Sequence, residues 1–238
     1  MGTQVRPDGK IRVIRMRMTL RGFKDWDAAM LETYSGTAKR VSQKLVVSEA
    51  AVRGWIMAAI DVRKAFLKGI TYEELAKETG ETKREVCFEL SEEAVAVLKT
   101  IPGYEDFDWR TEVLSCVRPG TGCKDAPRCW TIRLSRVTEG VWGAKPTTHD
   151  EHLIVRHDSR SKELDFMCTK HVDDLKPACH GDTMKQFVRV LEDCFGKGEL
   201  EITLHNFDCC GMRHSLTDKG YELDQFEYIK ALKPINNE

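Results

Sequence analysis

The sequence predicts an α+β fold, with an antiparallel sheet flanked by helices. Strand-like and helix-like segments are mixed along the chain, several strand segments are separated only by short turns, and no repeat or low-complexity linker divides them. The chain has 238 residues, of which 41% are hydrophobic, enough to bury a substantial core. We therefore expect a single compact unit with lobes.

Apolar periodicity predicts the elements of the first half of the chain. Alternation of apolar and polar residues indicates strands, and apolar residues spaced three and four apart indicate helices. The buried strand in this half ends on Asp61. The expected elements are a strand over 11–18, a helix over 35–55, a strand over 55–60, a short helix over 62–68, a polar surface excursion over 70–84, a strand over 85–90 and a helix over 91–98 capped by Ser91.

The second half begins with a glycine-punctuated loop over 118–124. Asp125 is suited to cap the helix that follows, and Pro127 to occupy its first turn. Asp173 and Asp174 separate two strand segments and are expected at the tip of a tight hairpin. The expected elements are strands over 152–156, 164–172 and 175–179, a helix over 182–195 closed by Gly196, strands over 199–204 and 207–212, and a helix over 225–232.

Charge and cysteine content restrict the function. The net charge of -1 argues against a purely electrostatic nucleic-acid binder, although the first forty residues are rich in Arg and Lys and residues 73–112 are acid-rich. No apolar run reaches the ~20 residues of a membrane span, and the first residues lack the apolar core of a secretory signal, so we expect a protein that stays on the reducing side of the cell. The nine cysteines lack C-x-x-C spacing. A metal site formed by His205, Cys209, Cys210 and His214 is a weaker interpretation than ordinary strands.

Three aspartates are candidates for a metal site. Asp61 ends a buried strand, and Asp173 with Asp174 occupies a hairpin, so both elements could bring carboxylates to one sheet edge. Mg²⁺ prefers oxygen ligands and shares its coordination shell with substrate phosphates. Turn formation and helix capping explain the same aspartates without a metal, so both interpretations remain open on the residues alone.

Six segments occur in order along nearly the whole chain. They are RMRMTLRGF at 15–23, ETYSGTAK at 32–39, IDVRKAFLKG at 60–69, GCKDAPRCW at 122–130, HVDDL at 171–175 and QFEYI at 225–229. Together they resemble the motifs of the reverse transcriptase domain of copia-type LTR retrotransposon polyproteins. The resemblance implies a fingers-and-palm polymerase core whose thumb is largely absent. Fingers-like parts would be 1–55 and 70–120, palm-like parts 56–69 and 121–223, and the start of the thumb 224–238.

The resemblance also implies roles for individual residues. Asp61 and Asp173 would ligate two Mg²⁺ ions, which Mn²⁺ could replace, with Asp174 beside them and the Val62 carbonyl available to one ion. Phe66 would lie under the incoming sugar and disfavour a 2′-hydroxyl; without the resemblance, a core phenylalanine is the simpler interpretation. Residues on the template and triphosphate side would be Arg15, Arg17 and Arg21, whose alternative is a solvated strand face, together with Lys124, Pro127 and Arg128.

Two departures from the family pattern affect the implied site. The family's glutamine is Asp125 here, which would repel phosphate unless Lys124 or Arg128 screens it, and the family's tyrosine before the aspartate pair is His171. Residues 70–84 look like an insertion. None of these changes removes an implied metal ligand.

The implied function is an RNA-directed DNA polymerase that transfers nucleotides from dNTPs to a primer 3′-hydroxyl on an RNA or DNA template. The rest of a Gag-Pol-type polyprotein, including RNase H and integrase, would lie outside this chain. The protein would be cytoplasmic, in a virus-like particle, or nuclear, and would not be secreted. The alternative is a catalytically degenerate remnant that at most binds nucleic acid or protein. A metal-dependent phosphohydrolase is disfavoured because no phosphate-binding loop is evident.

Overall fold

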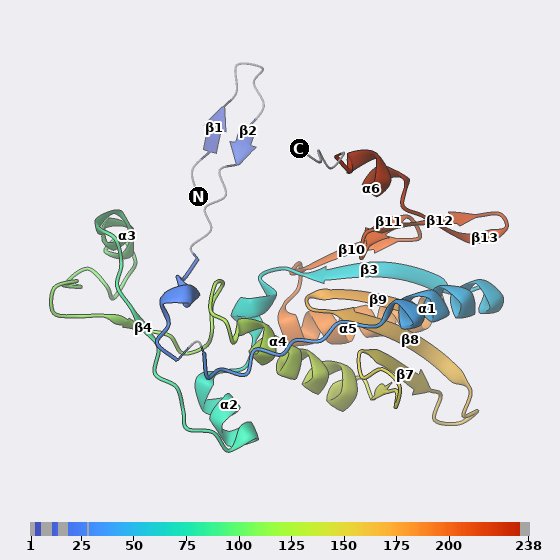
Figure 1. Cartoon of the computed structure of the whole chain (residues 1–238), viewed down its shortest axis with the longest axis horizontal. Helices are drawn as coiled ribbons and strands as arrows, with labels where there is room; N and C mark the ends of the chain where they lie inside the picture. The colour runs from blue at the N-terminus through green and yellow to red at the C-terminus, as the bar shows by residue number, and fades with distance from the viewer. Residues whose placement is uncertain (1–2, 6–10, 14–18, 28, 234–238) are drawn as a thin grey trace, which may run out of the picture. The chain divides into compact units, whose positions relative to one another are not determined.

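The computed structural model describes residues 3–5, 11–13, 19–27 and 29–233 (Figure 1). The sequence led us to expect one unit with lobes, but the chain packs as two compact units. The first unit comprises Met1–Thr33 and Thr71–Ala126, and the second comprises Tyr34–Ile70 and Pro127–Glu238. Each unit therefore has its own packing, and the second is described first because it contains the main sheet.

A six-stranded, wholly antiparallel sheet forms the centre of the second unit. The strands lie in the order β10-β3-β9-β8-β7-β6 (Figure 1). Their bounds are Leu200–Leu204 for β10, Ile56–Val62 for β3, Asp174–Cys179 for β9, Leu164–His171 for β8, Leu153–His157 for β7 and Lys145–Pro146 for β6. The α+β class with an antiparallel sheet is confirmed.

Each face of this sheet is covered by a different set of elements. Alternate residues of β3 point to opposite faces, so Ile60 packs in one hydrophobic cluster and Met57 in the other. The Ile60 cluster includes residues of α4 (Ala126–Ser135) and α5 (Gly181–Phe195). The Met57 cluster includes residues of α1 (Arg40–Arg53) and of the strand β11 (Phe207–Cys209). Asp61 follows Ile60, so it lies on the α1 face.

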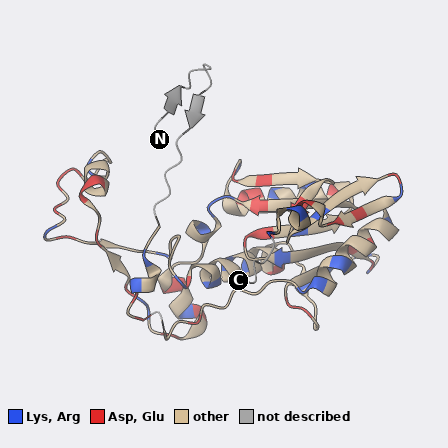
Figure 2. Ribbon diagram, turned by 45° about the horizontal axis from the view of Figure 1, so that its top comes forward, with Lys and Arg blue, Asp and Glu red and all other residues tan. Residues whose placement is uncertain are grey.

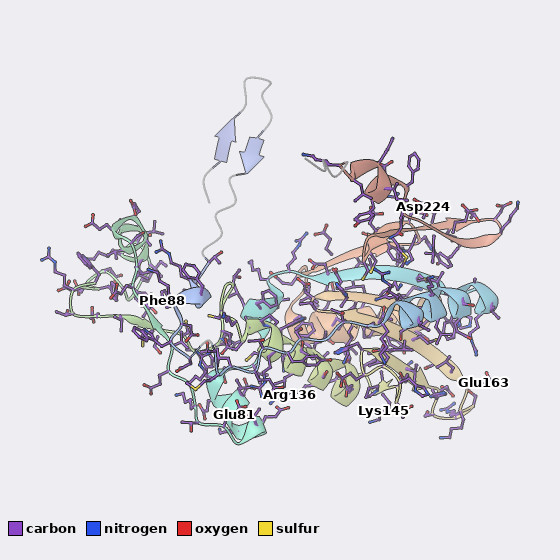
Figure 3. All side chains as sticks on the ribbon, in the orientation of Figure 1. Glu81, Phe88, Arg136, Lys145, Glu163 and Asp224 are labelled. Carbon is purple, nitrogen blue, oxygen red and sulfur yellow. The ribbon has the colours of Figure 1, made fainter. Side chains whose placement is uncertain are left out.

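The C-terminal part of the second unit is a small three-stranded antiparallel sheet. Its strands are β11 (Phe207–Cys209), β12 (Met212–Thr217) and β13 (Gly220–Asp224), and Asp224 is labelled in Figure 3. The single strand predicted over 207–212 is wrong, because Cys210 and Gly211 form a two-residue turn with φ values of 51° and 73°. The remaining helical elements of this unit are η2 (Ala65–Lys68), η3 (Arg136–Val141) and α6 (Phe226–Ala231).

The first unit contains short strands and helices. The strands are β1 (Thr3–Val5) paired with β2 (Ile11–Val13), and β4 (Cys87–Phe88) paired with β5 (Leu114–Ser115); the helices are η1 (Gly22–Lys24), α2 (Tyr72–Thr79) and α3 (Glu92–Leu98). The predicted cap of α3 is confirmed, since the Ser91 side chain accepts from the Ala94 amide. Acidic residues begin this helix, in the acid-rich part of the chain (Figure 2).

The surface excursion predicted over 70–84 is confirmed for residues 77–83, which are exposed, but is wrong for the first part of the segment. A capping box starts α2: the Thr71 side chain accepts from the Glu74 amide, and the Glu74 side chain accepts from the Thr71 amide. Tyr72 and Leu75 of this helix are buried. The segment therefore contributes to the packing of the first unit. Across the described part of the chain, no helix is long and apolar enough to cross a membrane.

Candidate active site

Three acidic residues form a row across neighbouring strands of the main sheet. In the register of the sheet, Asp61 of β3 lies opposite Asp174 of β9 on one side and opposite Glu201 of β10 on the other. Residues directly opposite in antiparallel strands project from the same face, with Cβ atoms about 4.5–5.5 Å apart. Asp173 precedes β9 in the hairpin. The two predicted carboxylate segments are therefore brought together, and Glu201 joins them.

The carboxylates of this row repel one another. Burial raises the pKa of Asp61, and Asp173, Asp174 and Glu201 raise it further, while Arg63 lowers it. Burial likewise raises the pKa of Asp174, with a further contribution from Asp173. Arg63 provides little compensation because its Nη2 atom is 3.8 Å from a Glu201 oxygen and both side chains are more than half exposed. The row carries excess negative charge.

The hairpin that carries the aspartate pair is held by several hydrogen bonds. Val172 occupies the turn with a φ of 54°, and its carbonyl accepts a 2.9 Å hydrogen bond from the Trp130 indole nitrogen. The Ala38 amide donates to the Lys170 carbonyl at 3.0 Å, and Thr37 forms a β-bridge with His171. Trp130 is fully buried in the core. Elements from α4 and from the segment before α1 thus fix the position of Asp173.

The donor chemistry of the row fits a hard divalent cation. Carboxylate oxygens are the ligands that Mg²⁺ prefers, and a cation would relieve the repulsion that raises the pKa of Asp61. Within the described residues, however, no group of three or more His, Cys, Asp or Glu side chains is arranged to hold a metal ion. The carboxylates are neighbours on one face, but their oxygens do not converge on one point.

Other predicted residues of the second unit lie in varied surroundings. Phe66 is partly buried in η2 and packs against the main hydrophobic cluster, which agrees with the core interpretation and leaves its contact with a sugar a prediction. Val62 is buried at the end of β3. His171 ends β8 and is half-buried, as are Pro127 and Arg128 in the first turn of α4.

The predicted site residues of the first unit differ in their exposure to solvent. Arg21 and Lys124 are exposed, whereas Asp125 is buried. Arg84 forms an ion pair with Asp125 and a second one, at 2.6 Å, with Asp25. Arg84, which is not among the predicted site residues, therefore screens the Asp125 carboxylate. Arg15 and Arg17 lie outside the described residues.

The four His and Cys residues considered for a metal site are not gathered around one point. His205 lies 3.3 Å from the Tyr221 hydroxyl, whereas the His214 ring stacks on Phe207 with centroids 4.7 Å apart. This agrees with the interpretation as ordinary strands. The neighbouring thiols of Cys209 and Cys210 are considered below, apart from any metal site.

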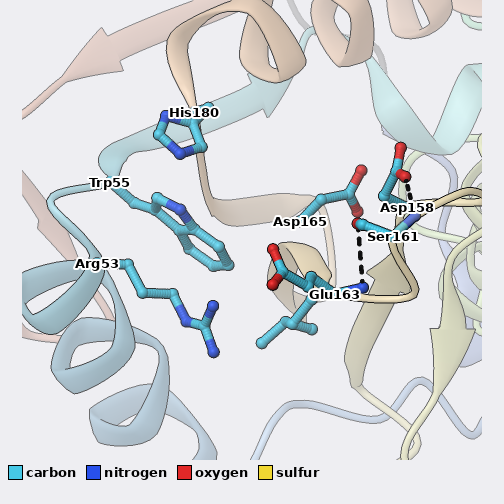
Figure 4. A pocket seen from close by; sticks show the side chains of 8 residues that line it. Arg53, Trp55, Asp158, Ser161, Glu163, Asp165 and His180 are labelled. Atoms are coloured by element: carbon cyan, nitrogen blue, oxygen red, sulfur yellow. Dashed lines mark hydrogen bonds between the residues drawn. The ribbon is translucent and has the colours of Figure 1, made fainter.

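A surface pocket of about 290 Å³ lies near the other end of β3, away from Asp61 (Figure 4). Trp55, which precedes β3, lies between Arg53 and His180 there. The other lining residues are Asp158, Ser161, Glu163, Leu164 and Asp165. None of the predicted site residues is among them, so this pocket is separate from the carboxylate row.

The fold and the carboxylate row define an α+β protein with acidic residues gathered on one face of an antiparallel sheet. No protein-family model matches the chain. Over 97% of its length the chain is 26% identical to the retrovirus-related Pol polyprotein from transposon RE2 and 24% identical to that from transposon RE1, both of Arabidopsis thaliana. The resemblance to copia-type retrotransposon Pol polyproteins is thereby confirmed.

The similarities cover different shares of the matched proteins. The chain spans about 14% of the length of each of the two Pol polyproteins. Among solved structures, telomerase from Candida albicans in complex with a fragment of telomeric RNA matches 81% of this chain and 35% of its own, with 11% sequence identity and a TM-score of 0.41. The sequence relationship to the Pol polyproteins is therefore the stronger finding.

Proposed function

We propose that the chain is a reverse transcriptase domain that catalyses RNA-directed DNA synthesis, with a fingers-and-palm arrangement. The observation that carries this proposal is the juxtaposition of Asp61 with Asp174 across β3 and β9, next to Asp173 in the hairpin. Similarity to Pol polyproteins over 97% of the chain supports it, because the motifs that contain these aspartates lie within the matched length.

Asp61, Asp173 and the Val62 carbonyl would hold two Mg²⁺ ions, with Asp174 beside them. When bound, such ions lower the pKa of an attacking hydroxyl and stabilise the leaving pyrophosphate. The protein's part is positioning: β3 and the hairpin hold the carboxylates on a rigid sheet, and the Trp130 hydrogen bond to Val172 fixes the turn next to Asp173. A primer end and a dNTP would meet over this row.

The remaining assignments belong to the same proposal. Phe66 would limit space beneath the sugar, His171 would lie near the primer end, and the exposed cations Arg21 and Lys124 would attract template or triphosphate. The matched relatives are polyproteins, so RNase H and integrase are proposed as further parts of the same polypeptide. Buried Asp125 is paired with Arg84, which removes the expected repulsion of phosphate at that position.

Primer extension tests the proposal. The purified chain is incubated with Mg²⁺, dTTP and an oligo(dT) primer on poly(A), and the wild type is compared with Asp173→Asn. We expect weak extension by the wild type on its own and none by the variant at any Mg²⁺ concentration, because the variant lacks a charge that we propose binds the metal. Asp182→Asn is the matched control, since Asp182 is exposed on α5. Extension by Asp173→Asn would contradict the assignment, and inactivity of the wild type would favour the degenerate remnant.

A further inference from the structure

The turn between β11 and β12 contains two adjacent thiols. Cys209 is buried at the end of β11, and Cys210 is exposed in the turn. Their sulfur atoms are 3.6 Å apart and within hydrogen-bonding contact. Cys210 and Gly211 both have positive φ, the pattern of a type I′ turn, in which the first position favours Asn, Asp or Gly. A cysteine at this position therefore strains the backbone more than Asn, Asp or Gly would.

A buried lysine lies near the thiols. Lys176 of β9 is 1% exposed; its ammonium donates to the Gln43 carbonyl at 3.1 Å and lies 3.4 Å from the His214 Nε2 atom. Burial lowers the pKa of Lys176, and the groups that favour its charged form are the thiols of Cys209, Cys210 and Cys168. The buried ammonium thus favours a thiolate among its neighbours.

Cys210 is also connected to the strands of the aspartate hairpin. The Gln43 side chain of α1 donates to the Cys210 sulfur at 3.7 Å and accepts a 3.1 Å hydrogen bond from the Thr169 hydroxyl. Thr169 and Lys176 are cross-strand partners in β8 and β9. The thiol pair is therefore part of a polar network that includes both strands of that hairpin.

We infer that Cys209 and Cys210 form an oxidation site, in which a hydroperoxide converts the two thiols to a vicinal disulfide. The Cys210 thiolate attacks the terminal peroxide oxygen, the O–O bond breaks, and the departing oxygen takes up a proton to leave as water or an alcohol. The Cys209 sulfur then displaces hydroxide from the Cys210 sulfenic acid; the S–O bond breaks, the S–S bond forms, and the Cys209 proton leaves with hydroxide as water. The thiols lose two electrons, which the peroxide gains.

The two thiols are suited to different steps of this reaction. Cys210 is accessible, and its hydrogen bond with Cys209 lowers its pKa, aided by His171 and Lys176 and opposed by burial and Asp174. Cys209 is shielded, and the same hydrogen bond together with burial raises its pKa. An accessible thiolate next to a resolving thiol is the arrangement typical of redox-sensitive cysteines. Adjacent residues have Cα atoms only about 3.8 Å apart, closer than in ordinary disulfides, so the bond should be readily reduced.

Peptide mapping after oxidation tests the inference. The purified chain is treated with equimolar hydrogen peroxide near neutral pH, quenched with an alkylating reagent and digested. We expect the peptide with Cys209 and Cys210 to lose two hydrogens, to take up no alkyl groups, and to recover both thiols after dithiothreitol. Cys87, which is exposed on β4, is the internal control and should remain alkylated.

Two variants test the attack by Cys210 and the displacement by Cys209 separately. Cys209→Ser should accumulate a sulfenic acid at Cys210, which dimedone traps. Cys210→Asn suits the type I′ turn and should leave Cys209 reduced at the same dose. The inference is overturned if the pair stays reduced while Cys87 is oxidised, or if dimedone does not label Cys210 in Cys209→Ser. The readout is a peptide mass, so it is independent of polymerase activity.

Discussion

The two units of the protein each contain a group of acidic residues, and the groups differ in how their charge is balanced. In the first unit, Asp25 and Asp125 share the guanidinium of Arg84, whose side chain is 14% exposed. In the second unit, Asp61 and Asp174 lie side by side, and Arg63 and His171 offset their charge only in part, since the pKa of both carboxyls is raised. Carboxylates that the protein neutralises itself stabilise a fold, whereas carboxylates left without a cation are suited to bind one.

The largest effect is expected when the internal cation is removed. Arg84→Met removes the ion pair between Arg84 and the buried Asp125 and should lower the unfolding free energy by about 3–5 kcal/mol, because a buried carboxylate loses the guanidinium that compensates its charge. Urea denaturation measures this. Arg63→Met is the control, and its exposed pair with Glu201 should be worth less than about 1 kcal/mol. An equal loss of unfolding free energy in the two variants would contradict the difference that we draw between the buried ion pair and the exposed one.

A smaller effect is expected when a cation is supplied to the second unit. Mg²⁺ should raise the unfolding free energy of the wild type by about 1.4 kcal/mol at a concentration about ten times its dissociation constant. Thermal denaturation with and without Mg²⁺ measures the shift. Asp61→Asn should respond less because a proposed ligand is lost, whereas Asp182→Asn, changed at an exposed position on α5, should respond like the wild type. The same shift in all three proteins would exclude the row as the binding site.

The smallest effect concerns pH. The folded-state pKa of Asp61 is raised above the ordinary 3.8, so its contribution to stability is greatest below that pH and falls as the pH rises through the folded-state pKa. Without Mg²⁺ near neutral pH, Asp61→Asn should therefore raise the unfolding free energy, by roughly 0.2–1 kcal/mol for each cross-strand repulsion removed. The gain should disappear below pH 3.8.

A second Asp→Asn variant is expected to change the unfolding free energy in the opposite direction. Asp165 accepts two hydrogen bonds from Arg156, at 3.1 and 2.6 Å, so Asp165→Asn should lower stability near neutral pH. Denaturation curves of both variants over a range of pH test the pair of expectations. A lower unfolding free energy of Asp61→Asn would show that other groups of the fold already compensate the negative charge of Asp61.

The sequence predicted the parts of the candidate site that depend on local patterns. The strand that ends near Asp61, the hairpin with Asp173 and Asp174, and the helix closed by Gly196 were confirmed because each has a clear apolar period and a turn signal. The Thr71-x-x-Glu74 pattern could have revealed α2, since it is a capping box. The polar composition of the segment concealed it.

The sequence could not reveal the features that depend on strand register and tertiary packing. Glu201 joins the carboxylate row only because β10 pairs with β3 in one register, and a shift of one residue would place it on the other face. Arg84 meets Asp125 through packing within the first unit, with no periodic signal in the sequence. Tertiary arrangement therefore decides which acidic residues are compensated.

The carboxylate row also affects the order of folding. The β8–β9 hairpin is local and can form early, but Asp61 meets Asp174 and Glu201 only when β3 enters between β9 and β10, which follow it at long range in the sequence. Pairing of β3 with β9 and β10 is therefore expected to be a late step of folding, which electrostatic repulsion opposes. Ions that screen this encounter should accelerate folding, so the same carboxylates would link the kinetics of assembly to the ionic conditions.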